Sequence, residues 1–495
     1  MDFQNRSEYC YFICYNFYAI FKDKVIQVPV SLKSLECIFT NKGHDMKRKE
    51  LVDLSFELNN FLLSEHLIQS EKPNTALFCI GKACIIYIRR FIYTIFLNVL
   101  KHGKLFRGKS YYKKQYDLKN IFFAPTLNNQ RALEDIIQKT NCYFLIDDIK
   151  DNNKYPIIQV YLISLKTFIF IIRKYLSLEN GKKKNIIGNE LINYILTCGF
   201  YYVDFYICQN VKIRSLIVSN DHTNFNRAFV KAANEKRIIT TYIQHASVAD
   251  YYPELKFTYS FLDGLDSLYK YASCHKTLDN TTVILLGAAR YDSLAQKRQV
   301  DKKMKYAIGI GINILDDEKI IEDISHRLST AFPEYKVIIR AHPNWRKSIH
   351  IYNSNISFTS AYDESIDVFL NKIDVLIAND SCIHLDAIKF QVPTLMYTFS
   401  KLGFSDQYSF VNSKLVKYIR SYEDLEKIIV DKSFYIPADD IIRLFDNSYK
   451  REYEGNVSLL IANIINEDFD KTFYSQLKLK QITDGRISYF QTSEC

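Results

Sequence analysis

Residues 374–397, DVLIANDSCIHLDAIKFQVPTLMY, decide the fold class. Apolar runs at 374–378 and 394–397 predict two strands, and the apolar spacing of 383–390 predicts a helix between them. Strand, helix and strand at this spacing are typical of a βαβ unit, in which the two strands run parallel. The sequence therefore predicts a parallel α/β sheet in this part of the chain.

The same alternation extends toward the N-terminus. Strands at 306–310 and 336–340 with a helix at 317–332 belong to the same series. An earlier series is predicted to contain helices at 129–139 and 224–234, a helical insertion at about 156–208, and strands at 120–125, 142–146, 215–218, 238–243, 257–260 and 283–286. Two such series imply two Rossmann-like, doubly wound domains facing a cleft.

Four regions follow from these patterns. Residues 1–116 are predicted as a basic, mostly helical N-terminal region, 117–300 and 301–440 as the two Rossmann-like domains, and 441–495 as a C-terminal helical tail. The length of 495 residues agrees with several domains. A hydrophobic share of 48% and a charged share of 24% exclude collagen-like, low-complexity and wholly disordered classes.

Positive charge is concentrated near the N-terminus. The chain carries a net charge of +10, and residues 1–116 hold 18 Lys and Arg against 10 Asp and Glu. The densest run, 101–114, has interleaved aromatic residues and contains no acid. It is interpreted either as a solvated loop or as a contact with an anionic membrane or lipid phosphate, and no motif for nucleic acid accompanies it.

The cysteines and the apolar stretches are used to predict the cellular compartment. The 11 cysteines are scattered and odd in number, which favours reduced, buried thiols in a cytoplasmic protein, and Cys10 and Cys14 have no second pair with which to form a zinc site. We see no signal peptide. The apolar stretches 75–100 and 156–172 are interrupted by Lys and Arg, so we expect amphipathic or buried helices, with peripheral attachment to the inner face of the cell membrane left open.

Two polar loops follow strands of the first series. Asn220-Asp221-His222 follows the strand 215–218, and Gln244-His245 follows the strand 238–243. Loops at the carboxyl ends of parallel strands are where such sheets bind ligands. A neutral imidazole there can take a proton from an attacking hydroxyl, and the alternative for each His is a structural role.

Two more polar loops follow strands of the second series. Arg340-Ala-His342-Pro343 offers a guanidinium and an imidazole to phosphate oxygens, and the alternative is an Arg held in a salt bridge. Asn379-Asp380-Ser381-Cys382 precedes a helix, where backbone amides and a hydroxyl can bind an anion or Ser381 can simply cap the helix. Asp386 lies one turn further, within reach of a ribose, and its alternative, shared with His384, is solvated helix surface.

In this order the segments resemble the two-domain nucleotide-sugar transferases of the GT-B fold, over about residues 117–440. The resemblance is to bacterial capsule, teichoic-acid and surface-polysaccharide enzymes, in particular the CDP-glycerol glycerophosphotransferase group. Tyr242–Ala246 is similar to that group's strand and His-Gly pair, with Ala246 in place of Gly, and Arg340–Pro343 matches its Arg-x-His-Pro segment. Asn379–Cys382 with Asp386 is similar to its Asp-Tyr-Ser-Ser segment and acidic helix residue, with Cys382 in place of the second Ser.

The resemblance implies a role for each region. Domain 117–300 would bind the acceptor, with His245 as the general base and Asn220, Asp221, His222 and Gln244 as orienting residues. Domain 301–440 would bind the nucleotide donor through Arg340, His342, Ser381, Cys382, Asp386 and Asn313, the last of which follows Gly309 and Gly311. His342 is counted with His245 as catalytic. Charge on the leaving group would be neutralised by these groups, so no metal or cofactor is expected.

The function implied is transfer of a sugar or polyol phosphate from a nucleotide-activated donor to a surface polysaccharide or lipid-linked acceptor in the cytoplasm. The second region also resembles the Asp-Ser-Gly-Gly loop of UDP-N-acetylglucosamine 2-epimerases, so an epimerase is one alternative. The other is a non-catalytic subunit of capsule assembly that keeps a GT-B shell.

Overall fold

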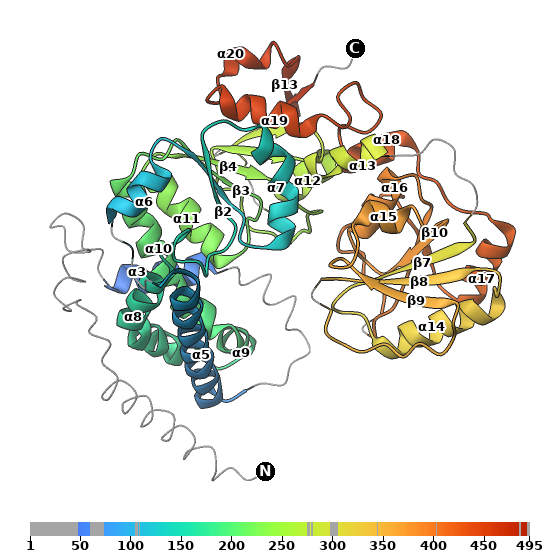
Figure 1. Cartoon of the computed structure of the whole chain (residues 1–495), viewed down its shortest axis with the longest axis horizontal. Helices are drawn as coiled ribbons and strands as arrows, with labels where there is room; N and C mark the ends of the chain where they lie inside the picture. Colours follow the sequence, from blue (N-terminus) through green and yellow to red (C-terminus); the bar gives the residue numbers. More distant parts are fainter. Residues whose placement is uncertain are drawn as a thin grey trace, which may run out of the picture. The chain divides into compact units, whose positions relative to one another are not determined.

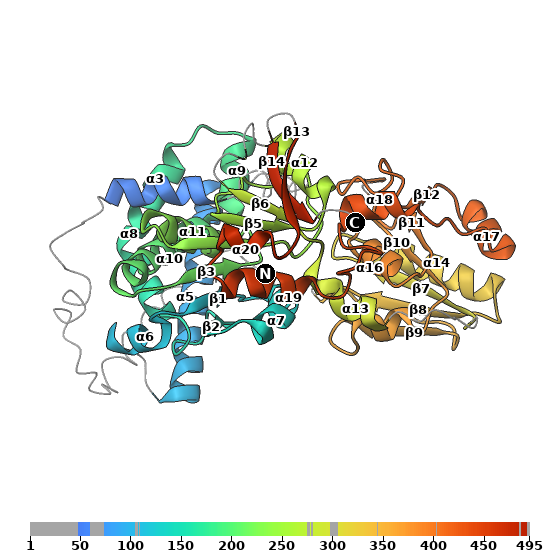
Figure 2. The same ribbon diagram turned by 90° about the horizontal axis from the view of Figure 1, so that it is seen from above.

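The computed structural model describes residues 48–59, 74–103, 107, 109–274, 278, 281–297, 305–343, 345–401, 403–484 and 487–492. The predictions for residues 1–47, with Cys10 and Cys14, lie outside this part of the chain. Two parallel sheets with helices on their faces make up most of the described residues (Figures 1 and 2). The predicted α/β class with two Rossmann-like, doubly wound sheets is confirmed.

The first sheet has eight strands in the order β13-β14-β6-β5-β4-β3-β1-β2. The strands are β1 (Asn120–Phe123), β2 (Tyr143–Ile146), β3 (Ser215–Val218), β4 (Ile239–Ile243), β5 (Tyr259–Leu262), β6 (Thr282–Leu285), β13 (Leu479–Asp484) and β14 (Ile487–Thr492). All neighbours are parallel except β13 and β14. The direction of winding reverses between β1 and β3, so the switch point of this sheet lies beside the loop that follows β3.

The second sheet has six parallel strands in the order β12-β11-β10-β7-β8-β9. They are β7 (Ala307–Ile312), β8 (Lys336–Ala341), β9 (Ile356–Ser360), β10 (Val375–Ala378), β11 (Thr394–Tyr397) and β12 (Lys417–Ile419). The central strands β7 and β10 are buried along their whole length, as strands covered on both faces must be. Winding reverses between them, which places the second switch point next to Asn313 and Asn379.

Helices cover both faces of the first sheet. On one face, α7 (Leu127–Lys139) and α19 (Val457–Asn466) share an apolar core with strand residues such as Phe122 and Ile217. On the other face, Phe123 packs against Phe225 and Phe229 in the first half of α11 (Asn224–Glu235). Behind α11 lie α10 (Leu191–Asn210) and α8 (Ile157–Ser177), and the remaining helices of this half are α3 (Arg48–Leu58), α5 (Ala76–His102), α6 (Lys109–Tyr116), α9 (Lys182–Asn189), α12 (Leu265–Cys274) and α20 (Lys471–Tyr474).

The second sheet is covered in the same way. One core cluster joins it to α14 (Glu318–Ala331) and α17 (Tyr422–Asp431). The opposite cluster joins it to α15 (Ile366–Leu370), α16 (Ile383–Lys389) and α18 (Asp439–Phe445), and also takes in residues of the short helices η1 (Ala289–Tyr291) and α13 (Asp292–Lys297).

The prediction of a helical tail at 441–495 is wrong for its last part. Helices α19 and α20 are present, but 479–492 form a β-hairpin whose second strand pairs in parallel with β6, Tyr489 opposite Val283. The hairpin completes the edge of the first sheet because β6 would otherwise leave its backbone groups unpaired. The strand predicted at 257–260 is shifted, since β5 begins at Tyr259.

Candidate functional site

The loop after β3 fixes the ring of His222. The Asn220 Oδ1 accepts hydrogen bonds from the backbone amides of His222 (3.1 Å) and Thr223 (2.9 Å), so the Asn220 Nδ2 is the atom 3.2 Å from His222 Nε2 and must donate to it. The other ring nitrogen, Nδ1, lies 3.0 Å from Asp221 Oδ1. His222 is thereby set as the tautomer that donates from Nδ1 to a carboxylate.

Asp221 is buried and stays ionised. Its side chain is fully enclosed, yet its second oxygen accepts a 2.6 Å hydrogen bond from the Tyr271 hydroxyl. Burial alone would raise the pKa of Asp221, but the contacts with His222 and Tyr271 outweigh it and the pKa lies below its usual range. Asn220 and Asp221 also line a hollow of about 40 Å³.

His245, after β4, lies beside this pair. Its ring centroid is 6.0 Å from that of His222. Burial lowers the pKa of His245 to about 3, and the neighbouring His222 adds to this while Asp221 opposes it. Its Nδ1 is buried and has no hydrogen-bond partner among the described residues. The imidazole is therefore neutral at pH 7, and its Nδ1 is a buried polar atom whose hydrogen bond is unsatisfied.

Gln244 supports the loop that carries His245. Its amide donates to the Ala246 carbonyl (2.8 Å) and the Ser267 hydroxyl (2.9 Å), and its Oε1 accepts from the backbone amide of Asp263 (3.0 Å). The side chain is 3% exposed. Gln244 thus holds the loop in place, whereas the sequence predicted that it orients the acceptor.

Arg290, which follows β6 in the short helix η1, lies between the two halves of the site. It donates to Asp263 Oδ2 (2.6 Å) and to the Gln244 carbonyl (3.3 Å). Its charge lowers the pKa of Asp386, which belongs to the second sheet's α16, although burial still raises that pKa to about 6. A hydroxyl of Tyr291 also hydrogen-bonds Asp386. Arg290 is thus close to both the loop of His245 and the helix of Asp386.

At the switch point of the second sheet the predicted Asn313 forms a turn. Its Oδ1 accepts from the Leu315 amide (2.8 Å), and its own amide nitrogen donates to Asp316 (2.7 Å). Asp316 is fully buried and also accepts from Asn379 Nδ2 at 2.8 Å. Burial raises the pKa of Asp316 to about 6. These contacts join the ends of β7 and β10, so Asn313 shapes the loop that was predicted to hold the donor.

Arg340, at the end of β8, is 5% exposed and forms no ion pair with another described residue. Its Nη2 donates to the Glu364 carbonyl (3.1 Å), and its Nη1 has no partner among the residues that the structure describes. Burial lowers its pKa, while Glu364 and Asp386 raise it. The alternative of a salt-bridged Arg is therefore wrong. His342, two residues on, is half-buried, and burial lowers the pKa of its ring.

The loop before α16 contacts the first half of the protein. Cys382 hydrogen-bonds Ser247, which lies in the loop that follows β4, and burial raises the pKa of its thiol. Ser381 is partly exposed, and its hydroxyl accepts weakly from the Ile383 amide (3.5 Å). Asp380 is held by Ser405 and the Gln407 amide (3.0 and 2.6 Å), while Gln407 accepts from the Tyr251 hydroxyl of the first half (2.8 Å).

His384 is not part of the site. It is fully buried, with Nδ1 2.6 Å from the Thr394 hydroxyl and Nε2 2.9 Å from the Asn379 carbonyl. The alternative of solvated helix surface is wrong for this residue, and its role is structural. Asp386, on the same helix, is partly exposed and lies among Arg290, Arg340 and Tyr291.

The structure brings most of the predicted residues to one place. The loop after β4 meets the Ser381–Asp386 segment through Ser247 and Arg290, and Arg340 interacts electrostatically with Asp386. His222, in the loop after β3, lies beside His245. This arrangement offers a neutral imidazole, a buried guanidinium with a free donor and several hydroxyls. In the described part of the chain, no three His, Cys, Asp or Glu side chains gather so as to hold a metal ion.

The fold and the site define an α/β protein of two Rossmann-like halves that share one polar site at the carboxyl ends of their strands. No family model and no curated protein matches the sequence. Three solved structures are among those similar to it. A UDP-GlcNAc 2-epimerase from Neisseria meningitidis bound to UDP-GlcNAc is 15% identical, over 71% of this chain and 100% of that one, with a TM-score of 0.43.

A variant of the wall teichoic acid polymerase TagF is 13% identical over 79% of this chain and 99% of that one, with a TM-score of 0.43. A UGT transferase from Siraitia grosvenorii in complex with UDP is 8% identical over 72% and 100%, with a TM-score of 0.42.

Proposed function

We propose that this protein is a glycosyltransferase that moves a sugar or polyol phosphate from a nucleotide-activated donor to a hydroxyl of a surface polysaccharide or lipid-linked acceptor. One observation supports the proposal: Arg290 interacts electrostatically both with His245, in the loop after β4, and with Asp386, on α16, so the proposed base and the proposed donor-binding group would share one site. Ligands of parallel α/β sheets bind beyond the carboxyl ends of the strands, so a site between two such sheets can hold a donor on one side and an acceptor on the other.

On the donor side, Arg340 and Ser381 would bind phosphate oxygens and Asp386 a ribose hydroxyl. The unpartnered Nη1 of Arg340 supports this, because a buried guanidinium donor without an acceptor costs free energy that an anionic ligand would recover. Helix α16 has only seven residues, so side chains would contribute more than its dipole. These groups would neutralise the departing nucleotide, and we propose transfer without a metal ion.

On the acceptor side, His245 would take the proton from the attacking hydroxyl as the new bond to the donor carbon or phosphorus forms and the bond to the nucleotide breaks. A pKa of about 3 keeps the imidazole neutral at pH 7, but a general base works best when its pKa lies near the working pH, so the base role requires the bound substrates to raise this pKa. The imidazolium that forms is stabilised by Asp221, whose charge already raises the pKa of His245. His222 would position the acceptor beside this pair.

The test is a donor panel. The protein is incubated with CDP-, UDP-, GDP- and CMP-activated donors, with and without a lipid-linked or oligosaccharide acceptor, in the presence of EDTA, and nucleotide release and product mass are measured. We expect release with one donor class, stimulated by acceptor. His245→Ala should abolish transfer and retain donor binding, Arg340→Met should weaken donor binding, and His350→Ala, at an exposed position, should change neither.

Three results would contradict the proposal. Normal turnover by His245→Ala would rule out His245 as the general base. An epimerised donor formed without acceptor assigns the site to a nucleotide-sugar epimerase. If titration shows that no donor binds, the protein is better described as a non-catalytic subunit of envelope assembly.

A further inference from the structure

Helix α5 exposes an unusually apolar outer face. Among the described residues, α5 and α10 are long and apolar enough to cross a membrane, but 78% of the most apolar window of α10 is buried inside the protein against 22% for α5. The side chains on the outer face of α5 recur at spacings of three, four and seven residues: Phe78, Ile85, Ile88, Ile92, Phe96 and Val99. An apolar stripe of this length at helical period normally packs against another element.

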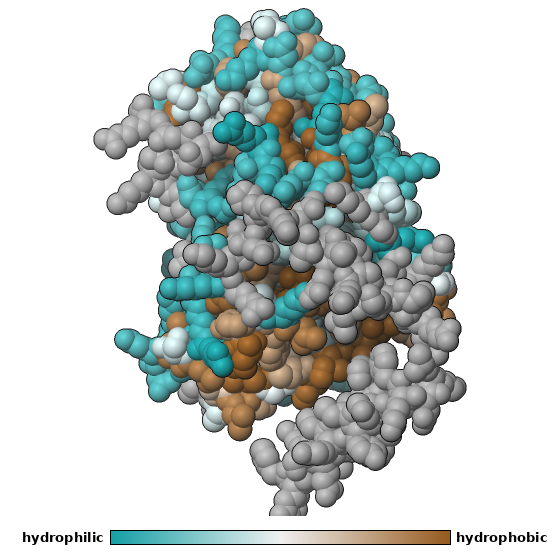
Figure 3. All heavy atoms as spheres, turned by 90° about the vertical axis from the view of Figure 1, so that its left-hand side faces the viewer, coloured by the Kyte–Doolittle hydropathy of each residue, from teal (hydrophilic) through white to brown (hydrophobic). Residues whose placement is uncertain are grey.

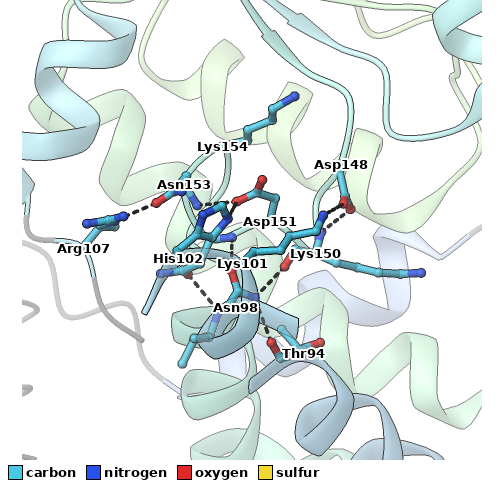
Figure 4. Close-up of polar contacts among 12 residues, drawn as sticks. Thr94, Asn98, Lys101, His102, Arg107, Asp148, Lys150, Asp151, Asn153 and Lys154 are labelled. Carbon is cyan, nitrogen blue, oxygen red and sulfur yellow. Dashed lines mark hydrogen bonds and ion pairs between the residues drawn. The ribbon is translucent and has the colours of Figure 1, made fainter. Parts of the chain in front are cut away.

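The inner face of α5 is fixed to the body of the protein. Asn98 donates to the Lys150 carbonyl (2.8 Å) and accepts from the Asn152 amide (2.7 Å), and the His102 ring lies 2.8 Å from Asp151 (Figure 4). Further along the helix, the Tyr87 hydroxyl bonds the Tyr161 carbonyl of α8. Because these buried polar contacts need the protein as partner, α5 can present only its outer face to another phase.

Helix α8 extends the same surface. Its ring contacts with α5 place the two helices side by side, Tyr161 packing against both Tyr87 and Phe91. Leu165, Ile169 and Leu176 of α8 are about half exposed. Figure 3, which looks at the side of the molecule where α5 and α8 lie, shows this apolar surface in its lower half.

The charged residues of the helices at this surface are all basic. Helices α5, α8 and α9 contain no Asp or Glu and ten Lys or Arg: Lys82, Arg89, Arg90 and Lys101 in α5, Lys166, Arg173 and Lys174 in α8, and Lys182–Lys184 in α9. Among the described residues, Lys101 forms an ion pair with Asp148, and Lys174 forms one with Asp53. Lys82 and Arg89 lie along one edge of the apolar stripe. Each is three or four residues from Phe78, Ile85 or Ile92, and residues at that spacing are neighbours on a helix surface. Such a rim is complementary to an anionic surface and not to a second copy of itself.

We propose that the α5–α8 surface docks on an anionic lipid bilayer, with α5 lying in the plane of the interface. Its apolar side chains would enter the boundary between headgroups and acyl chains, while the Lys and Arg at the rim contact lipid phosphates. Two signals, apolar area and cations, are what stable peripheral binding requires. This proposal is independent of the transferase activity.

The test uses the full chain and sedimentable vesicles of phosphatidylcholine alone or mixed with phosphatidylglycerol. We expect binding to the mixed vesicles and little to the neutral ones. Ile85→Asp with Ile92→Asp should reduce the partition coefficient about tenfold or more. The matched control is Val430→Asp with Ile436→Asp, two exposed apolar residues far along the chain, which should bind as the wild type does. Lys82→Gln with Arg89→Gln should reduce binding to the mixed vesicles and should not change binding to the neutral ones.

Because Ile85 and Ile92 are exposed, the folded state should tolerate both variants, and circular dichroism and thermal unfolding check this. Three results would overturn the proposal: no binding of the wild type to either vesicle, undiminished binding by Ile85→Asp with Ile92→Asp, or retention after an alkaline carbonate wash, which would mean that α5 crosses the bilayer. A wild-type dimer that the same variant converts to a monomer without loss of vesicle binding would assign the surface to a second copy.

Discussion

Replacing Arg290 by Met tests the centre of the candidate site. The substitution keeps much of the side-chain volume and removes the charge, so the Asp263 carboxylate loses its 2.6 Å partner and the Gln244 carbonyl its 3.3 Å donor. Asp263 is 2% exposed. Breaking a buried ion pair by removing one partner costs about 3–5 kcal/mol, because the remaining charge stays buried.

The cost should depend on pH. Burial raises the pKa of Asp263 to about 6, even though Arg290 lowers it, against 3.8 in the unfolded chain. When the pKa of a carboxyl is higher in the folded than in the unfolded protein, the folded state loses stability as the pH rises from 3.8 to the folded pKa. Without Arg290 the pKa of Asp263 in the folded protein is higher, so the variant keeps losing stability above pH 6. The difference in the free energy of unfolding between variant and wild type should therefore widen by up to about 1.4 kcal/mol per pH unit. Near pH 5 Asp263 is protonated in both proteins, and only the hydrogen bonds are lost, about 1–3 kcal/mol.

The assay is urea unfolding followed by far-ultraviolet circular dichroism at pH 5, 6, 7 and 8. Fluorescence of the single tryptophan, Trp345, follows the second half separately, since that residue belongs to its core. Lys297→Met is the control, because Lys297 is 57% exposed and its pair with Asp367 should contribute about 0–1 kcal/mol at every pH. A gap between Arg290→Met and wild type that stays constant from pH 5 to 8, or is under about 1 kcal/mol at pH 8, would refute this reasoning.

Two other substitutions test how the halves are joined. Lys389 is fully buried between Asp446 (2.6 Å) and Glu454 (2.8 Å), so Lys389→Met should cost about 3–5 kcal/mol in urea unfolding, and a loss no larger than a surface pair's would contradict this. Gly287 has a φ of +101°, and a Cβ there would come 2.5 Å from Asp446 Oδ1, so Gly287→Ala should destabilise by more than about 1 kcal/mol. Gly81→Ala, in the open interior of α5, should instead stabilise by up to about 1 kcal/mol, and equal effects at the two glycines would be inconsistent with this account.

The central strands could be predicted from sequence because burial on both faces leaves a continuous apolar run. β3 reads SLIV and β10 reads VLIA, and both are fully buried. Most strands at the sheet edges lack this signal, whereas the edge strand β2 reads YFLI and was predicted. β9 and β12 have exposed residues, and the hairpin β13–β14 exposes most of its first strand, so their sequences do not differ from loops.

The positions of the site loops could be predicted because the carboxyl end of a parallel strand is a fixed place in the fold. The hydrogen-bond and ion-pair partners of the side chains in these loops could not be predicted. Arg290 was not among the predicted site residues, since its partners are 27 and 46 residues away and follow other strands. Asp316 was missed for the same reason: its contact with Asn379 spans 63 residues. Only the strand order brings such groups together.

The two histidines of the acceptor side differ in a way that separates their roles. Both ring nitrogens of His222 are engaged, one by Asp221 and one by the Asn220 amide, so a proton can reach its Nε2 only if that amide turns away. His245 has a buried Nδ1 without a partner in the described part of the chain, and its pKa of about 3 leaves the ring neutral. A ligand hydroxyl that enters the site would satisfy this nitrogen first. Reduced transfer in His222→Ala with a normal pH profile, against complete loss in His245→Ala, would agree with this division, and the opposite pattern would assign the base to His222.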